Sequence, residues 1–166
     1  MKFFLNIVVL AIFLSACSHQ NAFSKFNMDK QEEFSVSNSQ TSKIKFKKNI
    51  KGVLSAIYLN EVNPSSFHGN EYFYVYLYLK DKNEVNDLND SIFNNVIKSA
   101  LTLNGQLPIE LRQLPRENEF SHLTSIKNKW NKYYLVTFKK NVKKLNLVFK
   151  QGEFSSEVLT YQKEKQ

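Results

Sequence analysis

The stretch EYFYVYLYLK, residues 71–80, alternates between two kinds of apolar side chain. The odd positions are aliphatic or phenyl: Phe73, Val75, Leu77 and Leu79. The even positions are all tyrosine: Tyr72, Tyr74, Tyr76 and Tyr78. Successive side chains of a strand point to opposite faces of the sheet. The pattern therefore predicts a β-strand with the first set toward the core and a row of tyrosines on the other face.

Two arrangements of the tyrosine row fit the sequence. Neighbouring side chains or the segment 18–42 can cover the rings, with the phenol ends reaching water. Alternatively, the row stays open as an aromatic platform for a protein or a sugar ring. Contiguous exposed apolar surface often marks a binding site, and tyrosine is enriched among interface hot spots. On the second interpretation Tyr72, Tyr74, Tyr76 and Tyr78 are binding residues.

The rest of the chain from residue 43 onward also reads as short strands. Alternating apolar patterns cover residues 43–47, 53–60, 101–103, 107–111, 132–140, 144–150 and 155–163. Residues 91–100 repeat apolar side chains at four-residue spacing, which predicts one short helix. Many short strands with almost no helix are typical of an antiparallel β-sandwich, here of about 7–9 strands in a domain spanning residues 43–166.

Asn104-Gly105 lies between two alternating apolar runs. This dipeptide favours the type I′ turn of a β-hairpin, because both central residues need a positive φ. Pro108 lacks a backbone N–H, so the strand that follows the turn is expected at a sheet edge.

The run LTLNGQLPIEL (101–111), the later strand KYYLVTF (132–138) and a C-terminal hairpin together resemble immunoglobulin-like domains of small bacterial lipoproteins, including those of ε-proteobacteria. The resemblance implies an immunoglobulin-like β-sandwich. The paired cysteines of antibody-type domains are missing, because the chain has a single cysteine.

The N-terminus resembles a bacterial lipoprotein signal peptide. A basic Lys2 precedes an apolar run over residues 3–14, which suits a signal sequence and is short for a membrane span. The run ends in Leu14-Ser15-Ala16-Cys17, which resembles a lipobox. The resemblance implies removal of residues 1–16, a thioether diacylglycerol on Cys17, and acylation of the new amino group by a fatty acid such as palmitate. Several acyl chains anchor a protein stably to a membrane.

Residues 17–42 are then the lipidated N-terminus and a flexible tether, because they are polar and lack sustained periodicity. Ser18 follows the lipidated cysteine, and this position favours the outer membrane under the enterobacterial sorting rule. The formal net charge is +8, which reflects either AT-rich codon usage or attraction to anionic surfaces. No nucleic-acid-binding motif is present, and export argues against such a partner.

No motif in the sequence predicts catalysis. His19, His68 and His122 are far apart and lack metal-ligand spacing. Phosphate-binding loops, nucleophile elbows and zinc-protease motifs are absent. We therefore expect no enzyme activity, catalytic residue, metal, cofactor or small-molecule substrate, although an unrecognised hydrolase site is a third alternative.

Asn89 lies in Asp87-Leu88-Asn89-Asp90-Ser91, which resembles the acceptor sequon of bacterial N-glycosylation. The match is also compatible with chance in a chain rich in asparagine. Asn89 is thus a candidate glycosylation site in a polar loop, where a transferase would have access.

The sequence predicts a lipoprotein of the outer membrane with a binding or adhesion role toward an unknown protein or glycan. The alternative is a periplasm-facing structural or accessory subunit of an envelope complex. Protection from protease on whole cells distinguishes the two, because only a surface-exposed domain would be digested.

The lipobox leads to the first testable prediction. Cys17→Ser should abolish labelling by a clickable fatty acid and leave an unprocessed precursor, because the chain has no other cysteine. Metabolic labelling and gel mobility measure both effects. Normal maturation of the variant would show that the protein is not a lipoprotein.

Overall fold

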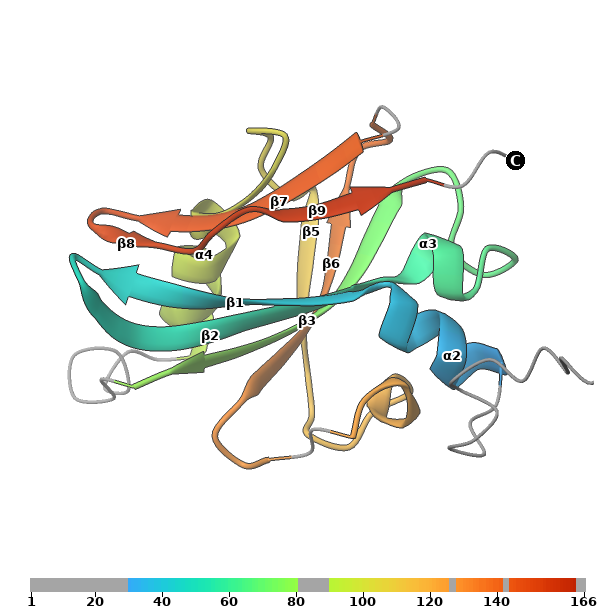
Figure 1. Ribbon diagram of the computed structural model, residues 1–166, viewed down its shortest axis with the longest axis horizontal. Coiled ribbons are helices and arrows are strands. Elements are labelled where there is room, and N and C mark those ends of the chain that lie inside the picture. The colour runs from blue at the N-terminus through green and yellow to red at the C-terminus, as the bar shows by residue number, and fades with distance from the viewer. Residues whose placement is uncertain (1–29, 81–89, 126–127, 142–143, 164–166) are drawn as a thin grey trace, which may run out of the picture.

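The computed structural model describes residues 30–80, 90–125, 128–141 and 144–163 (Figure 1). The strands are β1 (Ser39–Phe46), β2 (Asn49–Tyr58), β3 (Glu71–Leu79), β4 (Leu101–Leu103), β5 (Glu110–Leu114), β6 (Lys132–Phe138), β7 (Lys144–Gln151), β8 (Phe154–Ser155) and β9 (Leu159–Gln162). The helices are α2 (Lys30–Ser37), α3 (Leu59–Val62), α4 (Asp90–Ala100) and the 3₁₀ turn η2 (Ser121–Leu123). The predicted all-β class and the predicted helix over residues 91–100 are confirmed.

All strand pairs are antiparallel, and they form one curled sheet. The strand order is β4-β7-β8-β1-β2-β3-β6-β5, with β9 paired to β7. The strand β8 makes only short pairings, of two residues each, with β1 and with β7. The sheet therefore turns back on itself there, and β7 and β9 form an upper wall opposite β1, β2 and β3 (Figure 1).

The main hydrophobic core fills the space inside this curl. Phe73, Val75 and Leu77 of β3 are buried in it, and Leu79 packs against it. The opposite wall contributes a matching set from β7 and β9: Leu145, Leu147, Phe149, Leu159 and Tyr161. The predicted core face of residues 71–80 is confirmed. Burying each such side chain stabilises the fold by about 1.5–3 kcal/mol.

Side chains close the seam between β1 and β9, which do not pair through their backbones. The Gln40 amide donates to the Thr160 carbonyl oxygen and accepts from the Thr160 N–H, so it replaces one rung of a ladder. The Ser42 hydroxyl accepts from the Glu157 N–H at 2.9 Å. The Tyr161 hydroxyl of β9 also donates to the Ala56 carbonyl oxygen of β2, at 2.8 Å.

The prediction of a flexible tether is wrong for residues 30–42. These residues form α2 and the first half of β1, where Ser39 pairs with Ile57. The Ser35 hydroxyl is buried and donates to the Leu123 carbonyl oxygen at 3.0 Å. Long-range contacts of this kind stabilise a segment whose own sequence has little periodicity. The predicted signal peptide and the tether residues before Lys30 lie outside the described residues.

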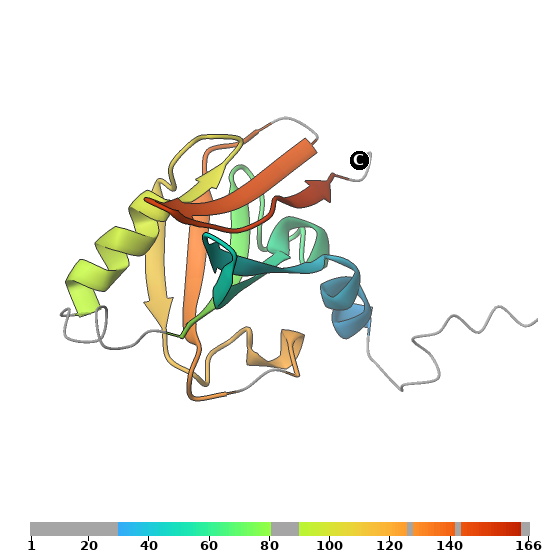
Figure 2. The same cartoon turned by 60° about the vertical axis from the view of Figure 1, so that its left-hand side comes forward.

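The Asn104-Gly105 turn is present and closes one antiparallel bridge, between Leu103 and Gln106, but the longer hairpin predicted around it is wrong. Both residues have a positive φ, 50° and 80°, as this turn requires. The flanking strands part, because β4 pairs with β7 and β5 pairs with β6. The Asn104 side chain accepts from the Asn146 N–H of β7 at 2.9 Å, which holds the turn to the upper wall. The strand after the turn lies at a sheet edge, as predicted, because β5 ends the strand order with α4 beside it (Figure 2). It begins at Glu110, so Pro108 lies in the loop before it and not in the strand predicted over residues 107–111.

A substitution at Gly52 tests how closely the backbones of β2 and β3 approach each other at this position. A Cβ at this position would clash with the Tyr78 carbonyl oxygen and lie 2.7 Å from Leu79 Cδ2. We expect Gly52→Ala to lower the free energy of unfolding by about 1–3 kcal/mol, the usual cost of overpacking. Asn49→Ala, exposed on the same strand, is the control and should change it by no more than about 0.5 kcal/mol. Equal urea midpoints for the two variants would contradict the close approach.

Candidate functional site

The tyrosine row of β3 is covered at Tyr72, Tyr74 and Tyr76 by a second hydrophobic core, and Tyr78 lies outside this core. Tyr74 is fully buried and Tyr76 is 5% exposed, whereas Tyr72 and Tyr78 are partly exposed. The Tyr72 ring lies 5.3 Å from the Phe67 ring, and the Tyr74 ring lies 5.3 Å from the Phe120 ring. The second hydrophobic core therefore covers most of the outer face.

The cover of this second core comes from the segments around α3 and η2. Its buried members besides the tyrosines of β3 are Ile57, Leu59, Val62, Leu114, Phe120, Leu123 and Tyr133. The Tyr74 hydroxyl accepts a 3.4 Å hydrogen bond from the Asn118 side chain, and burial raises the pKa of Tyr74 to about 12. The prediction of an open platform is wrong for Tyr74, because the protein's own chain covers its ring.

A groove of about 560 Å³ opens where this cover ends. Its lining comes from β2, β3 and the segment before β6: Val53, Ser55, Tyr76, Tyr78, Asn128, Lys129, Trp130 and Asn131. Small-ligand sites typically measure roughly 300–1,000 Å³, so the groove has the size of a binding site. The prediction of an open platform is also wrong for Tyr76, which is 5% exposed and belongs to the second core, and it remains a prediction for Tyr78.

The floor of the groove consists of two rungs of the β2–β3 ladder. Val53 pairs with Tyr78, and Ser55 pairs with Tyr76. Both strands are central, because β2 lies between β1 and β3, and β3 lies between β2 and β6. The Ser55 hydroxyl is 2.8 Å from the Thr41 hydroxyl of β1. The floor is therefore held on both sides by ladder pairing.

The wall of the groove is the turn over residues 128–131. The Asn128 carboxamide oxygen accepts from the Trp130 N–H at 3.0 Å and from the Asn131 N–H at 2.9 Å. The Tyr133 hydroxyl donates to the Asn128 carbonyl oxygen at 3.0 Å, which ties the turn to β6. These contacts present the Trp130 side chain, which is 42% exposed. The sequence pattern assigns Trp130 no role, because the residue is a single large aromatic among Asn and Lys side chains.

The charge of the groove is positive. Lys129 is its only charged lining residue in the part of the chain that the structure describes, and no Asp or Glu lines it there. The Lys129 ammonium lies 5.0 Å from the centre of the Trp130 ring, within cation–π range. The groove therefore suits neutral or anionic ligands better than cationic ones.

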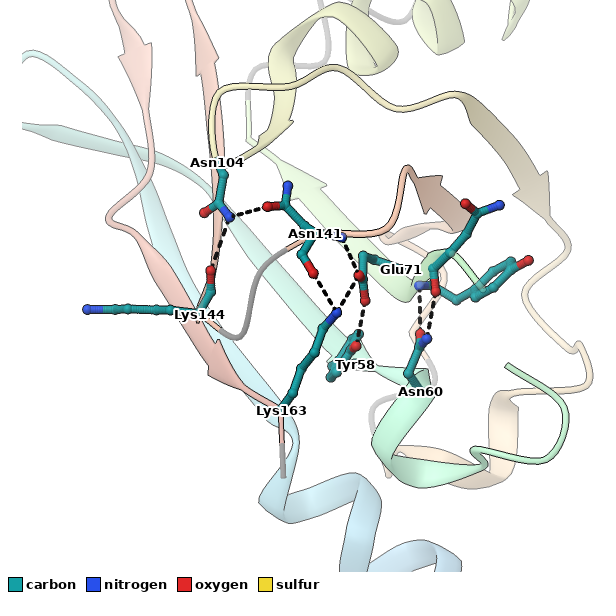
Figure 3. A network of polar contacts seen from close by, with 9 residues as sticks. Tyr58, Asn60, Glu71, Asn104, Asn141, Lys144 and Lys163 are labelled. Atoms are coloured by element: carbon teal, nitrogen blue, oxygen red, sulfur yellow. Dashed lines mark hydrogen bonds and ion pairs between the residues drawn. The ribbon is translucent and has the colours of Figure 1, made fainter. Parts of the chain in front are cut away.

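A buried polar network lies at the other end of β3, around Glu71 (Figure 3). Glu71 is 1% exposed, and its carboxylate accepts from the Tyr58 hydroxyl at 2.6 Å and the Asn141 N–H at 2.6 Å. Lys163 forms an ion pair with it at 2.5 Å and also donates to the Asn141 carbonyl oxygen. Burial, with the hydrogen bond and negative charge of Glu71, raises the pKa of Tyr58. Three donors occupy the carboxylate, so this network fastens strand ends together and offers no group to a substrate.

The other candidates from the sequence lie elsewhere or outside the described residues. Cys17, Asn89 and His19 are outside them. His68 and His122 are exposed in separate segments. Over the ranges that the structure describes, no group of three or more His, Cys, Asp or Glu side chains could hold a metal ion. In the same ranges, no helix is both long and apolar enough to cross a membrane.

Comparison with known proteins gives no relative. No protein-family model matches the chain, and neither a curated protein nor a solved structure is significantly similar to it.

Tyr74 and Tyr78 point to the same face of one strand and provide a matched test of the divided row. Tyr74→Ser should lower the free energy of unfolding by about 3–5 kcal/mol, because it empties a buried aromatic site. Tyr78→Ser should cost far less, on the order of 1 kcal/mol, because its ring is already partly in water. Denaturant unfolding of both variants measures the difference. Equal losses would contradict a cover that ends between the two rings.

Proposed function

We propose that the protein is a lipid-anchored bacterial envelope protein with a binding or adhesion role, and that it binds its ligand in the groove of Tyr76, Tyr78 and Trp130. The observation that carries the proposal is the open groove beside a closed core. The second core covers Tyr72, Tyr74 and Tyr76 of the same row, so the exposure of Tyr78 in the groove is a local feature of the fold. Clefts of this size, lined by aromatic side chains with a few polar groups, are typical of ligand sites.

The make-up of the groove supports a binding role. Tyr and Trp are the residues most enriched among interface hot spots, and they cost little conformational entropy when a ligand orders them. The floor lies on central strands and the wall is held by Asn128 and Tyr133, so the site is largely formed before binding. A preformed site loses less free energy to ordering when it binds.

The anchor in this proposal is the lipid on Cys17, at the outer membrane. A chain from Cys17 to the start of α2 at Lys30 can span at most about 45 Å even when fully extended. The groove would therefore work close to the membrane surface, on a protein or glycan of the envelope, with no role for nucleic acid. The finer fold description, an immunoglobulin-like β-sandwich, is also part of the proposal; the two walls that enclose the main core support it.

Site-specific photo-cross-linking in cells tests the proposed function without knowledge of the ligand. We expect p-benzoylphenylalanine at position 78 or 130 to give a discrete cross-linked product after irradiation, because both positions line the groove. The control places it at position 107, where Leu107 is 56% exposed on the loop between β4 and β5. Products that are absent at both groove positions, or equal at position 107, would overturn the proposal.

A further inference from the structure

We infer that the groove binds a short oligosaccharide, with the aromatic rings contacting the C–H faces of the sugar. This inference rests on the proposed function, because it names the ligand class of the same groove. Three properties of the lining carry it: its aromatic surfaces, its polar side chains and its charge.

The aromatic surfaces suit sugar rings. Tyr78 lies on the floor, and the partly exposed Trp130 forms the wall. The face of an aromatic ring carries partial negative charge, which attracts the weakly positive C–H groups on one face of a pyranose. A floor and a wall of this kind can contact a sugar from two directions.

The polar side chains suit the hydroxyls of a sugar. Asn128 is exposed and Asn131 is partly exposed in the lining, whereas Ser55 is 2% exposed and its hydroxyl lies 2.8 Å from that of Thr41. Hydroxyl and carboxamide groups can both donate and accept hydrogen bonds, as sugar hydroxyls do. The Asn128 carboxamide is already oriented, because its oxygen accepts from two backbone N–H groups of the turn.

An extended peptide fits this groove less well than a sugar. A peptide that adds to a sheet needs an edge with unpaired backbone groups. The floor strands β2 and β3 both have a neighbouring strand on each side, so they offer no such edge. A proline-rich peptide, which needs only aromatic surfaces, is the alternative occupant that the experiment must distinguish.

Acyl chains and cationic ligands also fit poorly. Val53 is the one aliphatic side chain of the described lining, whereas an acyl chain is best buried among aliphatic groups. A cationic ligand would meet Lys129 and no described carboxylate. The same lysine favours sugars that carry a carboxylate over neutral ones of equal length.

Saturation-transfer-difference NMR on the purified full-length protein tests the inference. The probes are trimers of glucose, N-acetylglucosamine and galacturonic acid. A nine-residue proline-rich peptide is tested in the same way, because it represents the alternative ligand. We expect transfer to the ring C–H protons of at least one trimer, stronger on one face of the sugar. Trp130→Ala and Tyr78→Ser should each weaken binding at least tenfold, and Lys129→Gln should weaken only the galacturonate trimer. Leu107→Ala is the control and should change nothing.

The outcomes separate this inference from the proposed function. Trp130→Phe keeps a ring in the wall and should bind more tightly than Trp130→Ala, which excludes simple misfolding as the cause. Transfer to no trimer, or binding of the proline-rich peptide instead, would overturn the inference while cross-linking from position 78 still supports a binding groove. Loss of cross-linking as well would overturn both.

Discussion

The structure depends on one strand that has no polar face. Between Glu71 and Lys80, β3 carries only aliphatic and aromatic side chains. Water must be excluded from both sides of such a strand, because each exposed side chain forgoes about 1.5–3 kcal/mol of burial. The upper wall of β7 and β9 covers one side, and the segments around α3 and η2 cover the other. The curl of the sheet therefore buries one face of β3, and the second core buries most of the other.

Hydrogen bonds and ion pairs of polar side chains join the strands that cover β3. Glu71 begins β3 and joins it to Tyr58 of β2 and to Lys163 beyond β9. Gln40 closes the seam of the curl by bonding to Thr160, which is 120 residues away in sequence. A buried carboxylate is costly unless it is fully paired, and the donors around Glu71 compensate its lost hydration. Such groups add less to stability than the cores do, but they favour one closure of the sheet over others.

The sequence predicts what is local in this fold and misses what is not. Period-two alternation predicts the strands and the two faces of residues 71–80, since that pattern is contained in the strand itself. Asn104-Gly105 likewise predicts its turn, but the partner of each flanking strand depends on β7 and β6, far away in the chain. The segment 30–42 looked like a tether because its order comes from contacts such as Ser35 with Leu123. Trp130 was missed for a related reason: its neighbours in the groove come from β2 and β3, not from its own stretch of sequence.

The same division explains how one row of tyrosines contributes both to a closed core and to the lining of an open groove. Tyr74 and Tyr78 occupy the same face of one strand, so the sheet holds both at a fixed spacing of about 13 Å along the strand. What differs is the cover: Phe120 lies over Tyr74, whereas the turn over residues 128–131 stands beside Tyr78 and leaves a hollow. Because Tyr133 contacts Tyr74 on one side and donates to Asn128 on the other, the closed core also supports the wall of the groove. The groove is therefore rigid at its base, and a ligand that enters it needs to order little more than the Trp130 and Lys129 side chains.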